Sequence, residues 1–141
     1  MNSLIQKITS ENDKWKNMKY CLEVVKNNGY DLQYVRVQTL EICLTAVQED
    51  GRALRYSKIQ TPELCLAATK KHWKMIKYVK NQTPEIGLAA VQQNGWAITY
   101  LNIQTLETCL AAAKKCEDHS SKFIVNILDL LHRIKIKTPE I

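Results

Sequence analysis

The sequence repeats itself every 22 residues over most of its length, and this repeat constrains the fold more than any other feature. A Gln-Thr pair opens successive copies at residues 38–39, 60–61, 82–83 and 104–105, and a Leu follows each Thr by five positions. A Tyr recurs late in the unit, at positions 34, 56, 78 and 100. Because these columns match at one fixed spacing, we expect tandem units that stack and bury their apolar faces against their neighbours. The Gln side chains could form a ladder between copies.

Each unit begins with the signals of a helix N-terminus. The Thr can act as N-cap, since its hydroxyl accepts a hydrogen bond from an unpaired backbone N–H. Pro62 and Pro84 occupy the first helical position, where a missing N–H is harmless, and a Glu follows in the first turn of each copy. Apolar residues surround most of this helix, so we expect it to be the inner layer. We expect Gly29, Gly51 and Gly95 to end it in the left-handed conformation.

The second half of each unit is shorter and predicts a second helix. In the second copy, Ala53, Leu54 and Ser57 would lie on one side of a helix, with the basic residues on the other. A short strand is the alternative, because apolar residues also alternate here and 22 residues is a leucine-rich-repeat length. The Leu-x-x-Leu-x-Leu-x-x-Asn signature of that class is absent from the sequence, which favours the helix.

The expected fold class is all-α: an α-solenoid of about five stacked 22-residue helix-turn-helix repeats with capping helices at both ends. We expect residues 1–16 to form the N-terminal cap. Residues 17–115 would form the tandem repeats (17–38, 39–60, 61–82, 83–104 and a partial copy at 105–115). The sequence diverges at 116–137, which has the pattern of a C-terminal capping helix. Residues 138–141 match the start of a further or truncated repeat.

The sequence contains no recognisable catalytic constellation, and we expect neither an enzyme nor a cofactor or metal ion. There is no glycine-rich phosphate loop and no His-Glu-x-x-His motif. Residues 109–119 hold two Cys and one His but lack the Cys-x2-Cys spacing of structural zinc sites. The remaining Cys share one repeat column with position 109, and Gly87 completes that column in the fourth copy, so the column fits small buried side chains better than disulfides.

The sequence also bears on the cellular compartment. No run of about 18 apolar residues could span a membrane. Residues 1–15 carry acidic side chains and lack the apolar block of a secretory signal. We therefore expect a cytoplasmic protein that is not secreted and does not bind a membrane.

Basic residues are concentrated in the second segments of two adjacent copies. Three outward positions carry a cation in both copies, so stacking in register would form a contiguous patch of six cations, with Arg36 nearby. Tyr30 and Trp96 continue the first of these columns on either side. Such a patch is either an ordinary solvated face or a site for an anionic partner, a nucleic-acid backbone or an acidic protein surface. We call it the basic patch and assign to it Arg52, Arg55, Lys58, Lys74, Lys77, Lys80 and Trp96.

The unit Thr-Pro-Glu-x-Cys-Leu-Ala-Ala-Val, followed by a polar run, Gly and Ala-Leu-x-Tyr-Val, resembles an uncharacterised short helical repeat family. That family is common in giant DNA viruses of amoebae and in some bacteria. The match covers residues 17–115 and is strongest over 61–104, while Trp73, Gly87 and residues 116–137 depart from it. The resemblance implies a repeat module, located in the host cytoplasm if viral, and it transfers no catalytic residue.

These observations favour a non-enzymatic repeat scaffold that mediates protein–protein interaction with an unknown partner, because stacked repeats expose a long surface. The alternative is binding of nucleic acid or another polyanion through the basic patch on the second and third repeats.

Overall fold

The computed structural model describes residues 13–115, 125, 127–129 and 131–133, and this part of the chain contains helices and no strand. An α-helix of ten residues and a 3₁₀-helix of six residues recur every 22 positions. The pairs are α2 (Met18–Asn27) with η1 (Gly29–Tyr34), α3 (Leu40–Glu49) with η2 (Gly51–Tyr56), α4 (Pro62–Lys71) with η3 (Trp73–Tyr78), and α5 (Pro84–Gln93) with η4 (Gly95–Tyr100), followed by α6 (Leu106–Lys115). The prediction of an all-α solenoid built from repeated helix pairs is confirmed, and the strand alternative is wrong.

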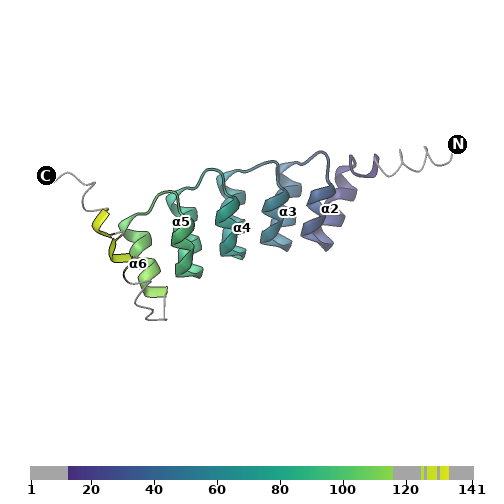
Figure 1. Ribbon diagram of the computed structural model, residues 1–141. Helices are drawn as coiled ribbons and strands as arrows, with labels where there is room; N and C mark the ends of the chain where they lie inside the picture. The colour runs from purple at the N-terminus through teal and green to yellow at the C-terminus, as the bar shows by residue number, and fades with distance from the viewer. Residues whose placement is uncertain (1–12, 116–124, 126, 130, 134–141) are drawn as a thin grey trace.

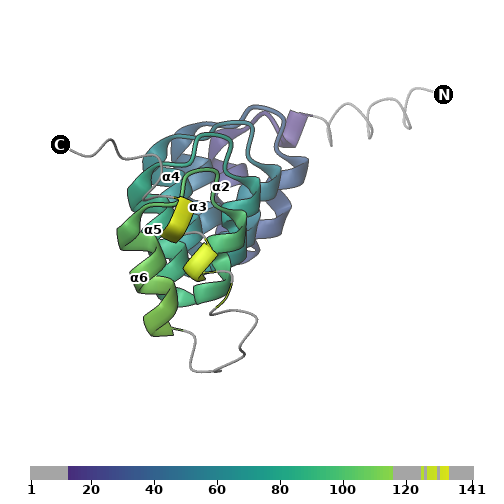
Figure 2. The same ribbon diagram turned by 60° about the vertical axis from the view of Figure 1, so that its left-hand side comes forward.

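The repeats form two layers. Figure 1 shows the α-helices side by side in one row, with the 3₁₀-helices behind them and the connecting segments along one edge. Each α-helix packs on its α neighbours, on the 3₁₀-helix of its own unit and on that of the preceding unit. Figure 2 shows the same units stacked one behind another. Stability in this arrangement comes from contacts within a unit and with its nearest neighbours.

The core lies between the two layers. The α-helices contribute Ile42, Leu64 and Ile86 to it, and each 3₁₀-helix contributes one fully buried Leu or Ile. The Cys and Ala columns predicted to be small and buried are so: Cys21, Cys43, Cys65 and Cys109 are buried free thiols, and Ala46, Ala68, Ala90 and Ala112 are fully buried. Small side chains at these positions let adjacent α-helices approach closely.

Local capping explains where each α-helix begins. The hydroxyl oxygens of Thr39, Thr61 and Thr83 accept hydrogen bonds from the backbone N–H three residues later, at 3.3, 3.2 and 3.3 Å. In the first copy Asn17 takes the same role and accepts from the N–H of Tyr20 at 3.2 Å. The predicted N-caps are therefore confirmed, and the degenerate first copy keeps its cap through a different side chain.

The prediction that glycine ends each α-helix in the left-handed conformation is wrong. No glycine among the described residues has a positive φ. Gly51 is instead the first residue of η2, and a Cβ there would lie 2.7 Å from the carbonyl oxygen of Ala68 and 2.8 Å from the Cβ of Lys71. Glycine is needed because η2 packs directly against the C-terminal end of α4 in the following unit.

The glutamine column connects consecutive units, although not as a side-chain ladder. The amide of Gln60 donates to the carbonyl oxygen of Tyr78 at 2.9 Å and accepts from the N–H of Lys80 at 2.9 Å. Gln38 and Gln82 bind the backbone of their following units in the same way. We call Gln38, Gln60 and Gln82 the glutamine clamp, since each ties its unit to the turn after the next 3₁₀-helix.

The ends of the chain are described only in part. The predicted C-terminal cap falls at 116–137, and the described positions within it are helical, with Ile127 buried and Leu131 packed against the core. At the other end Trp15 packs against the core, with its ring centroid 5.7 Å from that of Tyr34. Residues 1–12 of the predicted N-terminal cap and residues 138–141 lie outside the described residues.

Candidate functional site

The two layers differ in charge. The segments that contain the 3₁₀-helices (28–38, 50–60, 72–82 and 94–104) carry seven Lys or Arg and two Asp, a net charge of +5. The segments that contain the α-helices (17–27, 39–49, 61–71, 83–93 and 105–115) carry six Lys and six Glu and are neutral. The excess positive charge of the repeats therefore lies on the 3₁₀ layer.

The structure brings the residues of the basic patch together. Arg52 and Arg55 lie on η2 and Lys74 and Lys77 on η3, two helices that pack side by side, while Lys58 and Lys80 follow in the turns after them. All six cations and Trp96 are exposed. The predicted contiguity of the patch, which depends on stacking in register, follows from this arrangement.

Arg52 is the member of the patch that is most occupied within the protein. Its Nε lies 3.0 Å from Oδ1 of Asp50 and its Nη2 lies 2.8 Å from Oδ2, and the guanidinium also lies 5.0 Å from the ring centroid of Tyr30. The hydrogen bond from Arg52 lowers the pKa of Asp50, which also caps η2. Arg52 is thus paired with a carboxylate and is a weaker candidate for an external anion than its neighbours.

The Tyr column forms cation–π contacts with the patch, which sequence reasoning missed. The guanidinium of Arg55 lies 5.0 Å from the ring centroid of Tyr78, and the ammonium of Lys77 lies 4.1 Å from that of Tyr100. Both pairs join a cation of one unit to the Tyr found 23 residues later. That constant spacing was the available signal, because the Tyr residues had been recognised as a repeat column without a neighbour being assigned to them.

A second candidate surface lies on the opposite layer. The α-helices were expected to be an inner layer, but each presents one Leu on its outer side. Leu22, Leu44, Leu66 and Leu88 are only partly buried, and Leu110 is 50% exposed. We call these five residues the leucine face. They were missed as surface residues because a recurring Leu was taken as core.

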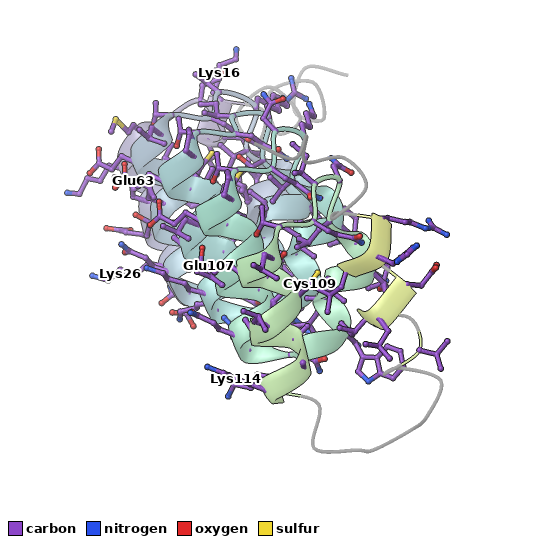
Figure 3. All side chains as sticks on the ribbon, turned by 90° about the vertical axis from the view of Figure 1, so that its left-hand side faces the viewer. Lys16, Lys26, Glu63, Glu107, Cys109 and Lys114 are labelled. Atoms are coloured by element: carbon purple, nitrogen blue, oxygen red, sulfur yellow. The ribbon has the colours of Figure 1, made fainter. Side chains whose placement is uncertain are left out.

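Charged rows flank the leucine face on both sides. Exposed Glu residues lie in the first turns of the α-helices, at positions 41, 63, 85 and 107. Exposed Lys residues lie in the last turns of α4 and α6, at positions 70, 71, 114 and 115. Figure 3 shows Glu63, Glu107 and Lys114 projecting from the α layer, whereas Cys109 lies on the other side of α6, toward the core.

Between α5 and α6 the leucine face is hollowed into a groove of about 360 Å³. Leu88, Leu110 and Ala111 provide its apolar lining, Glu107 lies toward one end, and Lys114 and Lys115 lie toward the other. A groove of this kind offers apolar contact along its floor and opposite charges at its two ends.

Neither surface contains reactive chemistry. Burial raises the pKa of the Cys43 and Cys65 thiols, which disfavours the thiolate that a nucleophile or metal ligand requires. In the described part of the chain no group of three His, Cys, Asp or Glu residues lies close enough to hold a metal ion. Within that part, too, no helix is both long and apolar enough to cross a bilayer.

No family model, curated protein or solved structure matches the chain. The resemblance to a short helical repeat family therefore stays a prediction that the repeat motif alone supports.

Proposed function

We propose that the protein is a non-enzymatic scaffold that binds a partner protein along the leucine face. The observation that carries this proposal is the groove between α5 and α6, where two leucines lie between a Glu row and a Lys row. Partly exposed apolar side chains that recur in a line and are bordered by charge are typical of protein interaction sites.

The partner that fits this surface is an amphipathic helix lying across the α-helices. Packed helices lie about 8–10 Å apart, and seven residues of a helix advance about 10.5 Å. A partner helix with an apolar residue at every seventh position would therefore meet one Leu per repeat. Charge complementarity places the basic residues of that helix toward the Glu row and its acidic residues toward the Lys row.

The experiment is an affinity capture from the native host followed by mass spectrometry, with matched variants as bait. Leu110→Glu changes the half-exposed Leu of the groove without opening a cavity in the core. The Lys74→Gln/Lys77→Gln variant alters only the opposite layer. We expect the partner to be lost with Leu110→Glu and retained with the Lys variant. Retention of the same partner by Leu110→Glu would refute the proposal.

A synthetic helix provides the direct measurement. We would titrate a heptad peptide with Lys along one flank of its apolar stripe and Glu along the other, and compare it by calorimetry with a peptide of the same composition whose charged flanks are both mixed. Tighter binding of the segregated peptide, lost when Glu85 and Glu107 are replaced by Lys, is the expected result. Equal affinity for both peptides would contradict the assigned charge complementarity.

A further inference from the structure

We infer that the 3₁₀ layer is a second binding site, for single-stranded nucleic acid, formed by alternating cations and exposed aromatic rings. This site is independent of the proposed protein-binding function because it lies on the opposite layer. The first argument is electrostatic: the 3₁₀ segments hold the +5 charge, while the α segments are neutral. A surface that neutralises several phosphates gains affinity through release of bound counterions.

The second argument is the exposure of the rings among these cations. Tyr78 is 40% exposed, Tyr100 is 39% exposed and Trp96 is 46% exposed. Large aromatic side chains at the surface of an adjacent set of repeats are unusual unless they contact something. Proteins that bind single strands combine a basic track with rings on which unpaired bases stack, and every base offers a π face to such a ring.

The third argument is that cation and ring are placed together by the repeat itself. Arg55 with Tyr78 and Lys77 with Tyr100 form the same cation–π pair in consecutive units. Each pair holds a charge beside a partly exposed ring, so one unit can contact a phosphate and a base. A stacking ring has no access to the paired bases of a duplex, which is why this arrangement favours a single strand.

The carboxylates in these segments do not cancel this charge. Asp50 is engaged by Arg52, and Asp31 accepts a hydrogen bond from the amide of Asn28 at 3.2 Å. The segment 72–82, which contains η3, has three Lys and no acid, and its neighbour 94–104 contributes Trp96 and Tyr100. The site is therefore centred on η3 and η4, with Arg55 of η2 at its edge.

The test is fluorescence anisotropy with a labelled oligo(dT) strand of about 20 nucleotides, a useful length because single-strand sites span several nucleotides per module. The main variant is Lys74→Gln/Lys77→Gln. Its matched control is Lys70→Gln/Lys71→Gln, which removes the same charge from the same repeat but on the α layer. At 0.1 M salt, a slope of about 0.7 per phosphate contact predicts a roughly 25-fold loss of affinity for the main variant. The dependence of log affinity on log salt should also become shallower, by about 1.4. The control should lose little.

A stacking variant distinguishes nucleic acid from an acidic protein surface. Trp96→Ala should weaken oligo(dT) binding by roughly fivefold or more, which is the low end of the stacking contribution of one base. Thermal melts check that each variant is folded. The inference is overturned if oligo(dT) does not bind at 50 mM salt, if both Lys variants lose affinity equally, or if a duplex of the same length binds at least as tightly. It is also overturned if polyglutamate competes fully while Trp96→Ala binds like the unmodified protein.

Discussion

The role of glycine between the layers can be tested by exchanging two glycines for alanine, with opposite results expected. At Gly51, a new Cβ would lie 2.7 Å from the carbonyl oxygen of Ala68 and 2.8 Å from the Cβ of Lys71. At Gly87, inside α5, a new Cβ would meet only the side-chain end of Leu101, at 3.1 and 3.3 Å. Neither glycine has a positive φ, so the exchange causes no backbone strain at either site.

The expected magnitudes follow from these distances. Ordinary contact at Gly51 would require η2 to move away from α4 by about 0.7 Å, and overpacking of this kind destabilises by about 1–3 kcal/mol. The stiffer unfolded chain offsets about 0.4–1 kcal/mol of this. We therefore expect Gly51→Ala to lower the free energy of unfolding by about 1–2 kcal/mol. Gly87→Ala should raise it by about 0.5–1 kcal/mol, because Ala is the better helix former and the Leu101 side chain can turn aside.

The assay is urea denaturation followed by far-UV circular dichroism, with Gly51→Asn as a third variant. If Gly51 were required for a left-handed conformation, Asn would be tolerated better than Ala. If close approach is the reason, Asn should be worse than Ala because its side chain is larger. Stability of Gly51→Ala equal to or above that of the unmodified protein would refute the close-packing argument.

Two further predictions concern contacts along the repeats. Gln60→Ala removes two hydrogen bonds to the backbone of the next unit, so we expect the free energy of unfolding to fall by about 1–3 kcal/mol, while the exposed Gln48→Ala in α3 should change little; equal midpoints for the two in urea would contradict the clamp. His72 provides no side-chain cap to η3, and among the described residues its buried Nδ1 has no hydrogen-bond partner. The corresponding residues Asn28 and Asn94 do cap their 3₁₀-helices, so His72→Asn should raise stability by about 1 kcal/mol, and a lowered melting temperature would show that ring packing outweighs the cap.

The sequence was sufficient to predict the repeat, the fold class and the starts of the α-helices. These features depend on short-range rules: a hydroxyl three residues from an unpaired N–H, Pro at the first helical position, and small residues at one column. Thr39, Thr61 and Thr83 behave as those rules predict. The register of the basic patch could also be predicted, because equal spacing along the sequence becomes adjacency once units stack.

The features that could not be predicted depend on contacts between units. Whether Gly51 was left-handed or closely packed depended on where α4 lies, which no local pattern states. The glutamine clamp and the Arg55–Tyr78 pair likewise join residues 18 to 23 positions apart in different units. The exposure of Leu110 could not be predicted either, since a Leu at helical spacing is more often buried, and only the two-layer arrangement leaves this side of the α-helices uncovered.

The division of labour within each unit explains why both surfaces can differ between copies without loss of the fold. The core, the caps and the glutamine clamp use the columns that face the neighbouring unit, and these columns keep their residue types along the chain. The outward column of the 3₁₀ layer instead changes from Tyr30 to Arg52, Lys74 and Trp96. Because that column makes little contribution to stacking, its residues are available for recognition. The change from cations to an exposed ring between η3 and η4 therefore marks the region where a ligand on this layer would be distinguished from its competitors.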